Sequence, residues 1–172
     1  MMKYFIRIFS MLLFCAVSLS CGDDDEFTNG REFVVDGDVL PSFVVETLSG
    51  ESVSSESLSE RPCVLVFFHT GCGDCRRELP VINDLYEEYS SEVNFLCIAR
   101  QQGADEVGNY WEEAKLSLPV APQETRTIYN LFAERGIPRV YVCEAGGRIS
   151  ARFTERVGKK KLRKAIEGVL NR

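Results

Sequence analysis

Apolar runs alternate with amphipathic stretches along most of the sequence after residue 60. Three short runs are rich in β-branched and aromatic residues and are apolar on both faces, which is typical of strands buried in a covered sheet: Cys63–Phe68, 93–99 and Arg139–Cys143. The last run is followed by a glycine-rich turn at 144–147 and a returning strand at 148–154, so these segments predict a β-hairpin.

Helical periodicity separates these strands. Apolar residues recur on one stripe after Cys72, in a helix that Pro80 should kink, and three further helices are predicted at 104–116, 125–134 and 159–170. The order strand, helix, strand, two helices, hairpin, helix predicts an α/β fold with a mixed central sheet flanked by helices.

The first 20 residues have the layout of a secretory signal. Lys3 and Arg7 precede an apolar run that is too short for an ordinary membrane span, and small residues precede Cys21. A cysteine in this place resembles the lipobox of bacterial lipoproteins, which implies that Cys21 becomes the lipidated first residue. Ser18 stands where that motif usually has Leu, and soluble secretion is the alternative.

The residues after Cys21 are polar and include an acidic block at 23–26, which is typical of a solvated tether. We therefore expect a signal peptide at 1–20, a lipidated flexible tether at 21–35 and one folded domain of ordinary size at 36–172. The acidic block resembles the signal that sends some lipoproteins of Gram-negative bacteria to the outer face of the outer membrane, with a plain spacer as the alternative. The implied location is the cell envelope, as an outer-membrane lipoprotein facing the periplasm or the cell surface.

The chain is acidic, with a net charge of −6 that becomes −8 if Lys3 and Arg7 leave with the signal. An acidic domain repels phosphate backbones, so we expect no nucleic-acid partner. The basic cluster at 159–164 is expected to be the solvated face of the last helix.

The strongest chemical signal is the CxxC pair Cys72 and Cys75, at the point where a buried strand gives way to a helix. Residues three apart share one face of a helix, so both sulfurs can meet, and the helix N-terminus favours thiolate over thiol. We predict a redox site in which Cys72 is the nucleophile and Cys75 resolves the mixed disulfide. A static disulfide is the alternative; a zinc site would need about four ligands, and no second CxxC or histidine pair is present.

These features together resemble the thioredoxin superfamily, and within it the exported TlpA-like thiol-disulfide oxidoreductases of bacteria. The resemblance covers nearly the whole predicted domain, through the lead-in segment at 37–50, the CxxC turn, Pro80, the helix around Trp111, and Ile137-Pro138 before a strand. It implies a thioredoxin-like three-layer sandwich. It also implies that the Ile137-Pro138 bond is cis and that both residues bind the substrate chain beside the sulfurs.

Four positions near the cysteines depart from that family or could modify its chemistry. Gly71 replaces the usual Trp, and Val66 replaces the usual buried acid. His69 is the only histidine, and it could either favour a Cys72 thiolate or simply be hydrogen-bonded at the strand end. Asp74 suits a helix N-terminus, yet its charge opposes a neighbouring thiolate.

The three cysteines outside the CxxC and the N-terminal segment lie in apolar β-type runs, so we expect buried, inert thiols. In the thioredoxin topology Cys63 and Cys143 lie close together on neighbouring antiparallel strands. We expect both to be free, because cross-strand neighbours rarely meet disulfide geometry without strain. The third is Cys97.

We therefore predict a lipid-anchored thiol-disulfide oxidoreductase that reduces or exchanges disulfides in exported proteins without a metal or other cofactor. Its expected partners are protein thiol or disulfide substrates, an upstream thiol donor and the membrane, and it is expected to be a monomer. Copper handling on the same fold would usually need wider cysteine spacing and a distant histidine. A redox-inactive binding protein would have a degraded CxxC, and a thiol peroxidase would have Thr where His69 stands.

Overall fold

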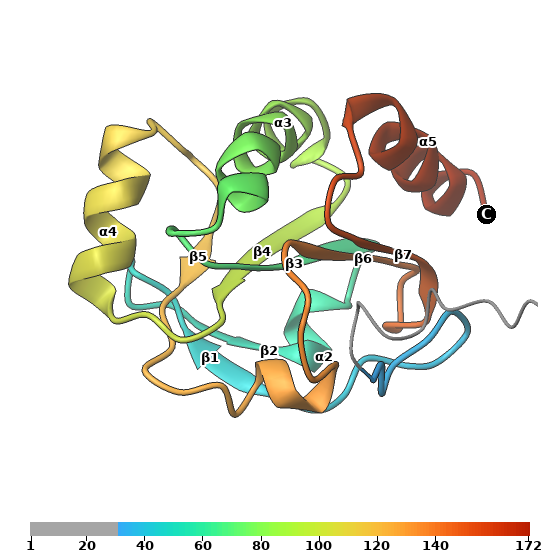
Figure 1. Cartoon of the computed structure of the whole chain (residues 1–172). Coiled ribbons are helices and arrows are strands. Elements are labelled where there is room, and N and C mark those ends of the chain that lie inside the picture. The colour runs from blue at the N-terminus through green and yellow to red at the C-terminus, as the bar shows by residue number, and fades with distance from the viewer. Residues whose placement is uncertain (1–30) are drawn as a thin grey trace, which may run out of the picture.

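A computed structural model of the protein describes residues 31–172. Within them, a five-stranded mixed sheet has the order β5-β4-β3-β6-β7, and a two-stranded sheet pairs β1 with β2 (Figure 1). The strands are β1 (Val44–Glu46), β2 (Ser52–Ser54), β3 (Cys63–Phe68), β4 (Asn94–Ala99), β5 (Val120–Ala121), β6 (Arg139–Cys143) and β7 (Ile149–Thr154). The helices are α2 (Ser55–Leu58), α3 (Gly73–Tyr89), α4 (Ala104–Glu113), the 3-10 helix η2 (Tyr129–Leu131) and α5 (Lys159–Leu170).

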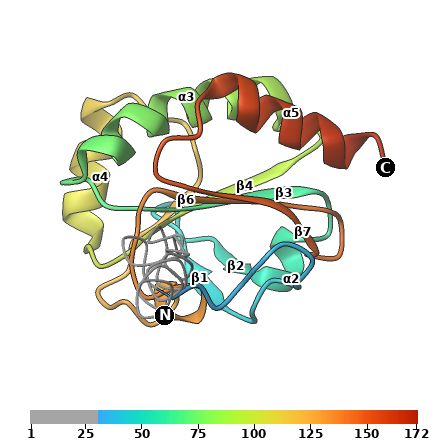
Figure 2. The same cartoon turned by 45° about the vertical axis from the view of Figure 1, so that its right-hand side comes forward.

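The five-stranded sheet lies between two covering layers (Figures 1 and 2). Helices α3, α4 and α5 pack on one face, while β1, β2, α2 and the segment around η2 cover the other. Two apolar clusters fill the spaces on either side of the sheet. The predicted thioredoxin-like three-layer α/β fold is confirmed.

Strand β3 lies at the centre of this sheet, and all six of its residues are buried. It runs parallel to β4 and antiparallel to β6. Its alternate side chains enter the two clusters, with Val64 facing the helices and Leu65 the opposite layer. Because β3 and β4 end where β6 begins, the segments that follow or precede these strand ends meet at one edge of the sheet.

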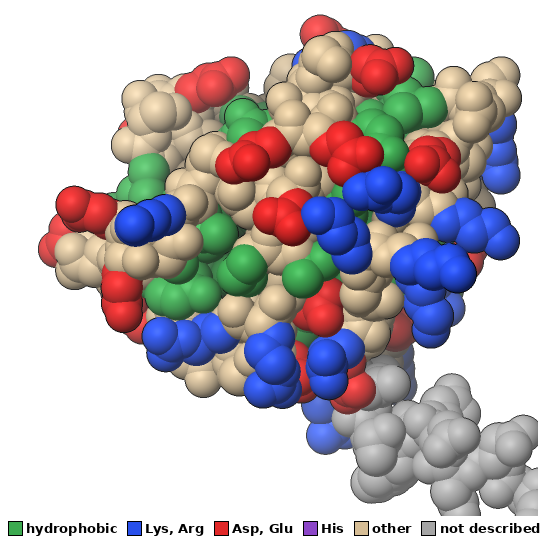
Figure 3. All heavy atoms as spheres, turned by 90° about the horizontal axis from the view of Figure 1, so that it is seen from above, with side chains coloured by type: hydrophobic (Ala, Val, Ile, Leu, Met, Phe, Trp, Pro, Cys, Tyr) green, Lys and Arg blue, Asp and Glu red, His purple; other side chains and the backbone are tan. Residues whose placement is uncertain are grey.

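Helices α3 and α5 lie side by side on the helical face, which carries charged side chains of both signs (Figure 3). Lys159 pairs with Asp84 at 2.7 Å, and Arg163 pairs with Glu88 at 2.6 Å. These exposed pairs contribute little stability, so the apolar stripe of α5 accounts for most of its attachment. That stripe consists of Leu162, Ile166 and Val169.

The prediction of a helix at 125–134 is wrong, because only the three residues of η2 are helical there. The backbone of this segment pairs instead with the N-terminal segment. Glu32 and Ala133 form an antiparallel bridge, and Phe33 N–H donates to the Phe132 carbonyl at 2.9 Å. Once these groups bond to another part of the chain, they are not available to continue a helix.

The domain also begins earlier than predicted. Residues 31–35, expected to belong to the flexible tether, lie against the loop that contains η2, and Val34 is buried. The predicted signal peptide, the lipidation site Cys21 and the rest of the tether lie outside the described residues. Among residues 31–172, no helix is long and apolar enough to cross a membrane.

Candidate functional site

The CxxC pair lies at the edge of the sheet where β3 ends and α3 begins. Cys72 is the N-cap residue of α3, in an extended conformation with φ −84° and ψ 121°, and its sulfur accepts the Cys75 N–H at 3.4 Å. Cys72 is partly exposed, whereas Cys75, one turn into the helix, is fully buried. The pair therefore presents one sulfur to solvent and keeps the second directly behind it.

Burial raises the pKa of the Cys75 thiol well above its ordinary range, and the neighbouring Cys72 thiol raises it further. A backbone hydrogen bond from His69 and the charge of Arg100 act in the opposite direction but are smaller. Cys75 is therefore a protonated thiol at neutral pH. The two sulfurs differ in access, and the buried one is held as a thiol, which suits the role of resolving cysteine for Cys75.

Ile137 and Pro138 face the cysteines from the opposite side of the site. The peptide bond between them is cis, as predicted. Cys72 Sγ lies 3.6 Å from the Ile137 carbonyl oxygen, to which its thiol can donate. The backbone of this segment is thus the part of the protein nearest to the partly exposed sulfur on that side.

His69 and Asp74 are both engaged in local contacts. His69 Nδ1 accepts the Gly71 N–H at 2.9 Å, which makes His69 part of the turn before the CxxC. A Cβ atom on Gly71 would lie 3.2 Å from that ring nitrogen, so the turn in this form favours glycine where the family usually has Trp. Asp74 pairs with Arg77 within the first turns of α3.

A buried polar cluster beside the CxxC turn was not predicted from the sequence. Gln102, which follows β4, accepts the Thr70 N–H at 2.7 Å through Oε1 and donates to Thr70 Oγ1 at 2.6 Å through Nε2. It also donates to Glu106 in the first turn of α4. The only sequence signal was a polar residue three positions after a buried strand, and that signal does not identify a partner 32 positions away.

Glu78 is a second polar residue that sequence reasoning did not single out. It lies one helical turn after Cys75 and is only 3% exposed. Its Oε2 accepts the Gly158 N–H at 3.1 Å, and its Oε1 lies 3.8 Å from Arg156 Nε. This carboxylate ties α3 to the start of α5 beneath the redox pair.

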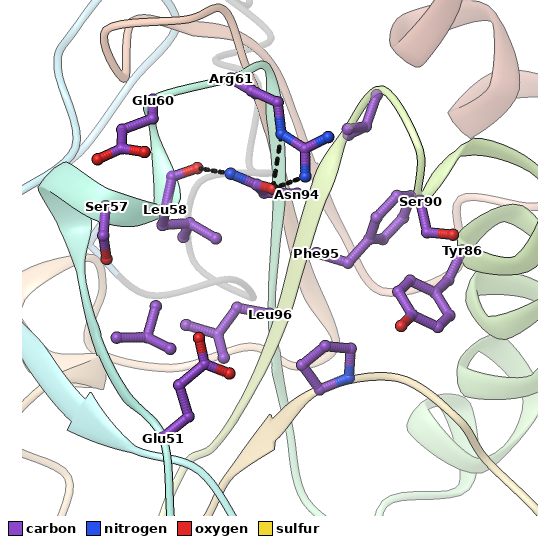
Figure 4. Close-up of a pocket in the computed structure, with 13 residues that line it drawn as sticks. Glu51, Ser57, Leu58, Glu60, Arg61, Tyr86, Ser90, Asn94, Phe95 and Leu96 are labelled. Carbon is purple, nitrogen blue, oxygen red and sulfur yellow. Dashed lines mark hydrogen bonds between the residues drawn. The ribbon is translucent and has the colours of Figure 1, made fainter. Parts of the chain in front are cut away.

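An open pocket of about 430 Å³ lies at the other end of β4, among residues from β2, α2, α3 and β4 (Figure 4). Asn94 Oδ1 accepts a hydrogen bond from Arg61 Nε at 3.1 Å, and Asn94 Nδ2 donates to the Leu58 carbonyl at 2.9 Å. No cysteine or histidine lines this pocket. Within residues 31–172, no group of three or more His, Cys, Asp or Glu side chains is placed to hold a metal ion.

A thioredoxin-like sheet with a CxxC pair at a helix start and a cis-proline facing it defines a dithiol protein of the thioredoxin class. The sequence model of the AhpC/TSA family matches residues 37–152, and the chain belongs to this family.

Sequence relatives of this chain include thiol-disulfide oxidoreductases named ResA. The chain is 23% identical to the thiol-disulfide oxidoreductase ResA of Bacillus cereus, over 99% of this chain and 96% of that protein. It is 25% identical to ResA of Halalkalibacterium halodurans over 86% of this chain and 84% of that one. The predicted enzyme class agrees with these names.

Solved structures show the same fold. A thiol:disulfide interchange protein of the thioredoxin family from Chlorobium tepidum is 26% identical, with a TM-score of 0.70 over 80% of this chain and 99% of that one. A thio-disulfide isomerase from Thermus thermophilus is 25% identical, with a TM-score of 0.66 over 79% and 97%. The predicted membership in the thioredoxin superfamily is confirmed.

Proposed function

We propose that this protein is a thiol-disulfide oxidoreductase of the bacterial cell envelope that acts on disulfides of exported proteins through Cys72 and Cys75. The observation that carries this proposal is the asymmetry of the pair. Cys72 is partly exposed at the start of a helix, and Cys75 is buried behind it with a raised pKa. Attack from outside is therefore directed to one sulfur, while the other is held in reserve.

The reaction then has two balanced steps. The Cys72 thiolate attacks one sulfur of a substrate disulfide, which forms a mixed disulfide and releases the other substrate sulfur as a thiolate. Cys75 next loses its proton and attacks Cys72 Sγ, which forms the Cys72–Cys75 disulfide and releases the second substrate thiol. The substrate gains two electrons, and an upstream thiol donor must return two electrons to the pair before the next cycle.

The raised pKa of Cys75 bears on the second step. Because a thiol is a poor nucleophile, the mixed disulfide persists until Cys75 is deprotonated. Protein substrates with an extended segment would lie against the backbone at Ile137 and Pro138, which borders Cys72. We also propose that His69 and Asp74 modulate the reactivity of the Cys72 thiolate.

The location and the anchor rest on the sequence. The signal-like residues 1–20, Cys21 and the acidic segment after it support a lipid-anchored outer-membrane protein of a Gram-negative bacterium, facing the periplasm or the surface. We expect the mature protein to be a monomer. Metabolic labelling with a fatty acid should mark the wild-type chain and leave Cys21→Ala unlabelled, and equal labelling of both would contradict the anchor.

The activity is tested with the full-length chain in an insulin-reduction assay with dithiothreitol as donor. Cys72→Ser should abolish turnover, and Cys75→Ser should accumulate mixed disulfides that are visible on non-reducing gels. Cys97→Ser is the matched control for Cys75→Ser, because it also removes a buried thiol but lies within β4 rather than in the first turn of α3. Equal turnover by wild type and Cys72→Ser would refute the proposal.

A further inference from the structure

The carbonyl groups of Arg135 and Gly136, just before the Ile137-Pro138 bond, accept hydrogen bonds from buried side chains. Arg139 donates to the Arg135 carbonyl from Nη2 at 2.6 Å and from Nε at 3.2 Å. The Tyr129 hydroxyl donates to the Gly136 carbonyl at 2.9 Å. The next carbonyl along the chain is the one that lies 3.6 Å from Cys72 Sγ. Holding the first two carbonyls thus orients the third toward the sulfur.

Arg139 makes these contacts from a fully enclosed position. It is the first residue of β6, and it is only 1% exposed. An isolated buried guanidinium would be strongly unfavourable, so it needs a counter-charge and hydrogen-bond acceptors. Its Nη1 atom donates to Glu32 Oε1 at 2.9 Å and to Thr154 Oγ1 at 3.2 Å. Glu32 therefore supplies a carboxylate that makes this burial tolerable.

Glu32 reaches Arg139 because its segment is bonded to the loop that contains Tyr129. The Glu32–Ala133 bridge and the hydrogen bond from Phe33 N–H to the Phe132 carbonyl align the two stretches. Arg152 on β7 pairs with the same carboxylate. The first described residues after the predicted tether are thus part of the structure that shapes the site.

We propose that Arg139 and Tyr129 are positioning residues for segment 135–137, and that Glu32 is the counter-ion that Arg139 requires. The base of the N-terminal segment and the thiol site then form one cooperative unit. This inference rests on the proposed function, because it concerns the backbone against which a protein substrate lies while Cys72 attacks its disulfide. Neither a small disulfide nor an alkylating reagent needs that backbone.

Two variants of the full-length chain test this arrangement. Glu32→Gln keeps the size of the side chain and removes its charge, and Tyr129→Phe removes only the hydroxyl that holds Gly136. Glu88→Gln is the charge-matched control, since Glu88 pairs with Arg163 at 2.6 Å on the α3–α5 surface. Ile166→Val is the stability control, because it makes a small cavity in buried α5 residues away from the segment.

We expect Glu32→Gln and Tyr129→Phe to lower kcat/KM for insulin reduction about tenfold, as expected when one positioning hydrogen bond is lost. The rate at which the reduced chain attacks a small aromatic disulfide should stay at the wild-type value. Hydrogen exchange of a peptide covering 130–139 should become faster in these two variants. It should not change in Glu88→Gln or Ile166→Val.

The proposal is overturned if both variants match Glu88→Gln in turnover and exchange. It is also overturned if protein and small disulfides slow equally, as they should in a variant that is only less stable, such as Ile166→Val. A wild-type chain that fails to reduce insulin would refute the proposed function instead. The exchange data would then still decide the positioning role, because unchanged exchange at 130–139 in Glu32→Gln contradicts it.

Discussion

Gln102 is expected to stabilise the turn that presents Cys72, and its side chain can be removed without breaking the main-chain contacts around it. Gln102 is only 3% exposed, and its side chain forms hydrogen bonds with both the backbone N–H and the hydroxyl of Thr70. Its backbone N–H and carbonyl bond instead to Gln123, at 2.7 and 2.9 Å. Gln102→Ala therefore deletes the side-chain contacts while this loop-to-loop bridge remains.

The expected loss follows from what each partner keeps. The Thr70 N–H donates to Gln102 Oε1, so in Gln102→Ala this buried donor loses its acceptor at a cost of about 1–3 kcal/mol. The Thr70 hydroxyl still donates to Glu106 at 3.2 Å, so it adds little. Truncation also removes buried methylene contacts, worth about 0.8 kcal/mol per CH₂. We expect the free energy of unfolding to fall by about 2–3 kcal/mol.

Urea unfolding followed by the fluorescence of Trp111, the single tryptophan, measures this change. Gln101→Ala is the matched control, because Gln101 is the exposed neighbour of Gln102. The rate of Cys72 alkylation should also change in Gln102→Ala, since the turn before Cys72 loses its anchor. If Gln102→Ala unfolds at the same urea concentration as Gln101→Ala and reacts at the same rate, the assigned role of Gln102 is wrong.

Three further predictions concern thiols and the core. Of the five described cysteines, Cys72 should be labelled by iodoacetamide on the native, unreduced chain at pH 8. The buried thiols at positions 63, 97 and 143 should be labelled only after unfolding. A disulfide-bridged peptide that joins Cys63 to Cys143 would contradict this. Burial raises the pKa of Cys97 above its ordinary 9.0, so the folded chain keeps a proton that the unfolded chain releases. Its stabilising effect is fully present below pH 9, and the free energy of unfolding should fall as the pH rises further, less steeply in Cys97→Ala than in wild type. Asn83→Ala should lower the free energy of unfolding by about 2–4 kcal/mol, because Asn83 Oδ1 accepts the N–H groups of Ser117 and Leu118 at 2.7 and 3.2 Å; Asn83→Asp keeps an acceptor there, and an equal loss in both variants in thermal unfolding would argue against this explanation.

The strands that contain Cys63, Cys97 and Cys143 show how much of the sheet could be predicted from local sequence pattern and from the topology of the family. The run Cys63–Phe68 was predicted with the bounds that the structure has, and its pairing opposite Cys143 is confirmed. Burial of Cys97 was predicted equally well. The bounds of β3 and the burial of Cys97 are signalled within about six consecutive residues, because an apolar run with β-branched side chains is recognisable without its neighbours. The pairing with Cys143 followed instead from the topology that the family resemblance implies.

The failed helix at 125–134 shows the limit of the same reasoning. Its apolar spacing fits a helix, but Tyr129 and Phe132 instead pack on Phe67 from a loop, with ring centroids 5.5 and 4.7 Å away. Pairing with the N-terminal segment then takes the backbone groups that a helix would use. Tertiary contacts override a short stretch of helical periodicity because the periodicity by itself is worth little.

The sequence by itself determined the position of the CxxC at a helix start. Together with the family resemblance it also indicated the antiparallel pairing that places Cys63 beside Cys143, and the cis-proline that faces the cysteines. These depend on residues close together in the chain or on a fixed topology. Only the tertiary structure decided that Gln102 holds the turn before Cys72, and that Glu32 balances the buried charge of Arg139 from 107 positions away. A buried polar group must find its partner wherever the fold brings one, and sequence spacing carries no record of that distance.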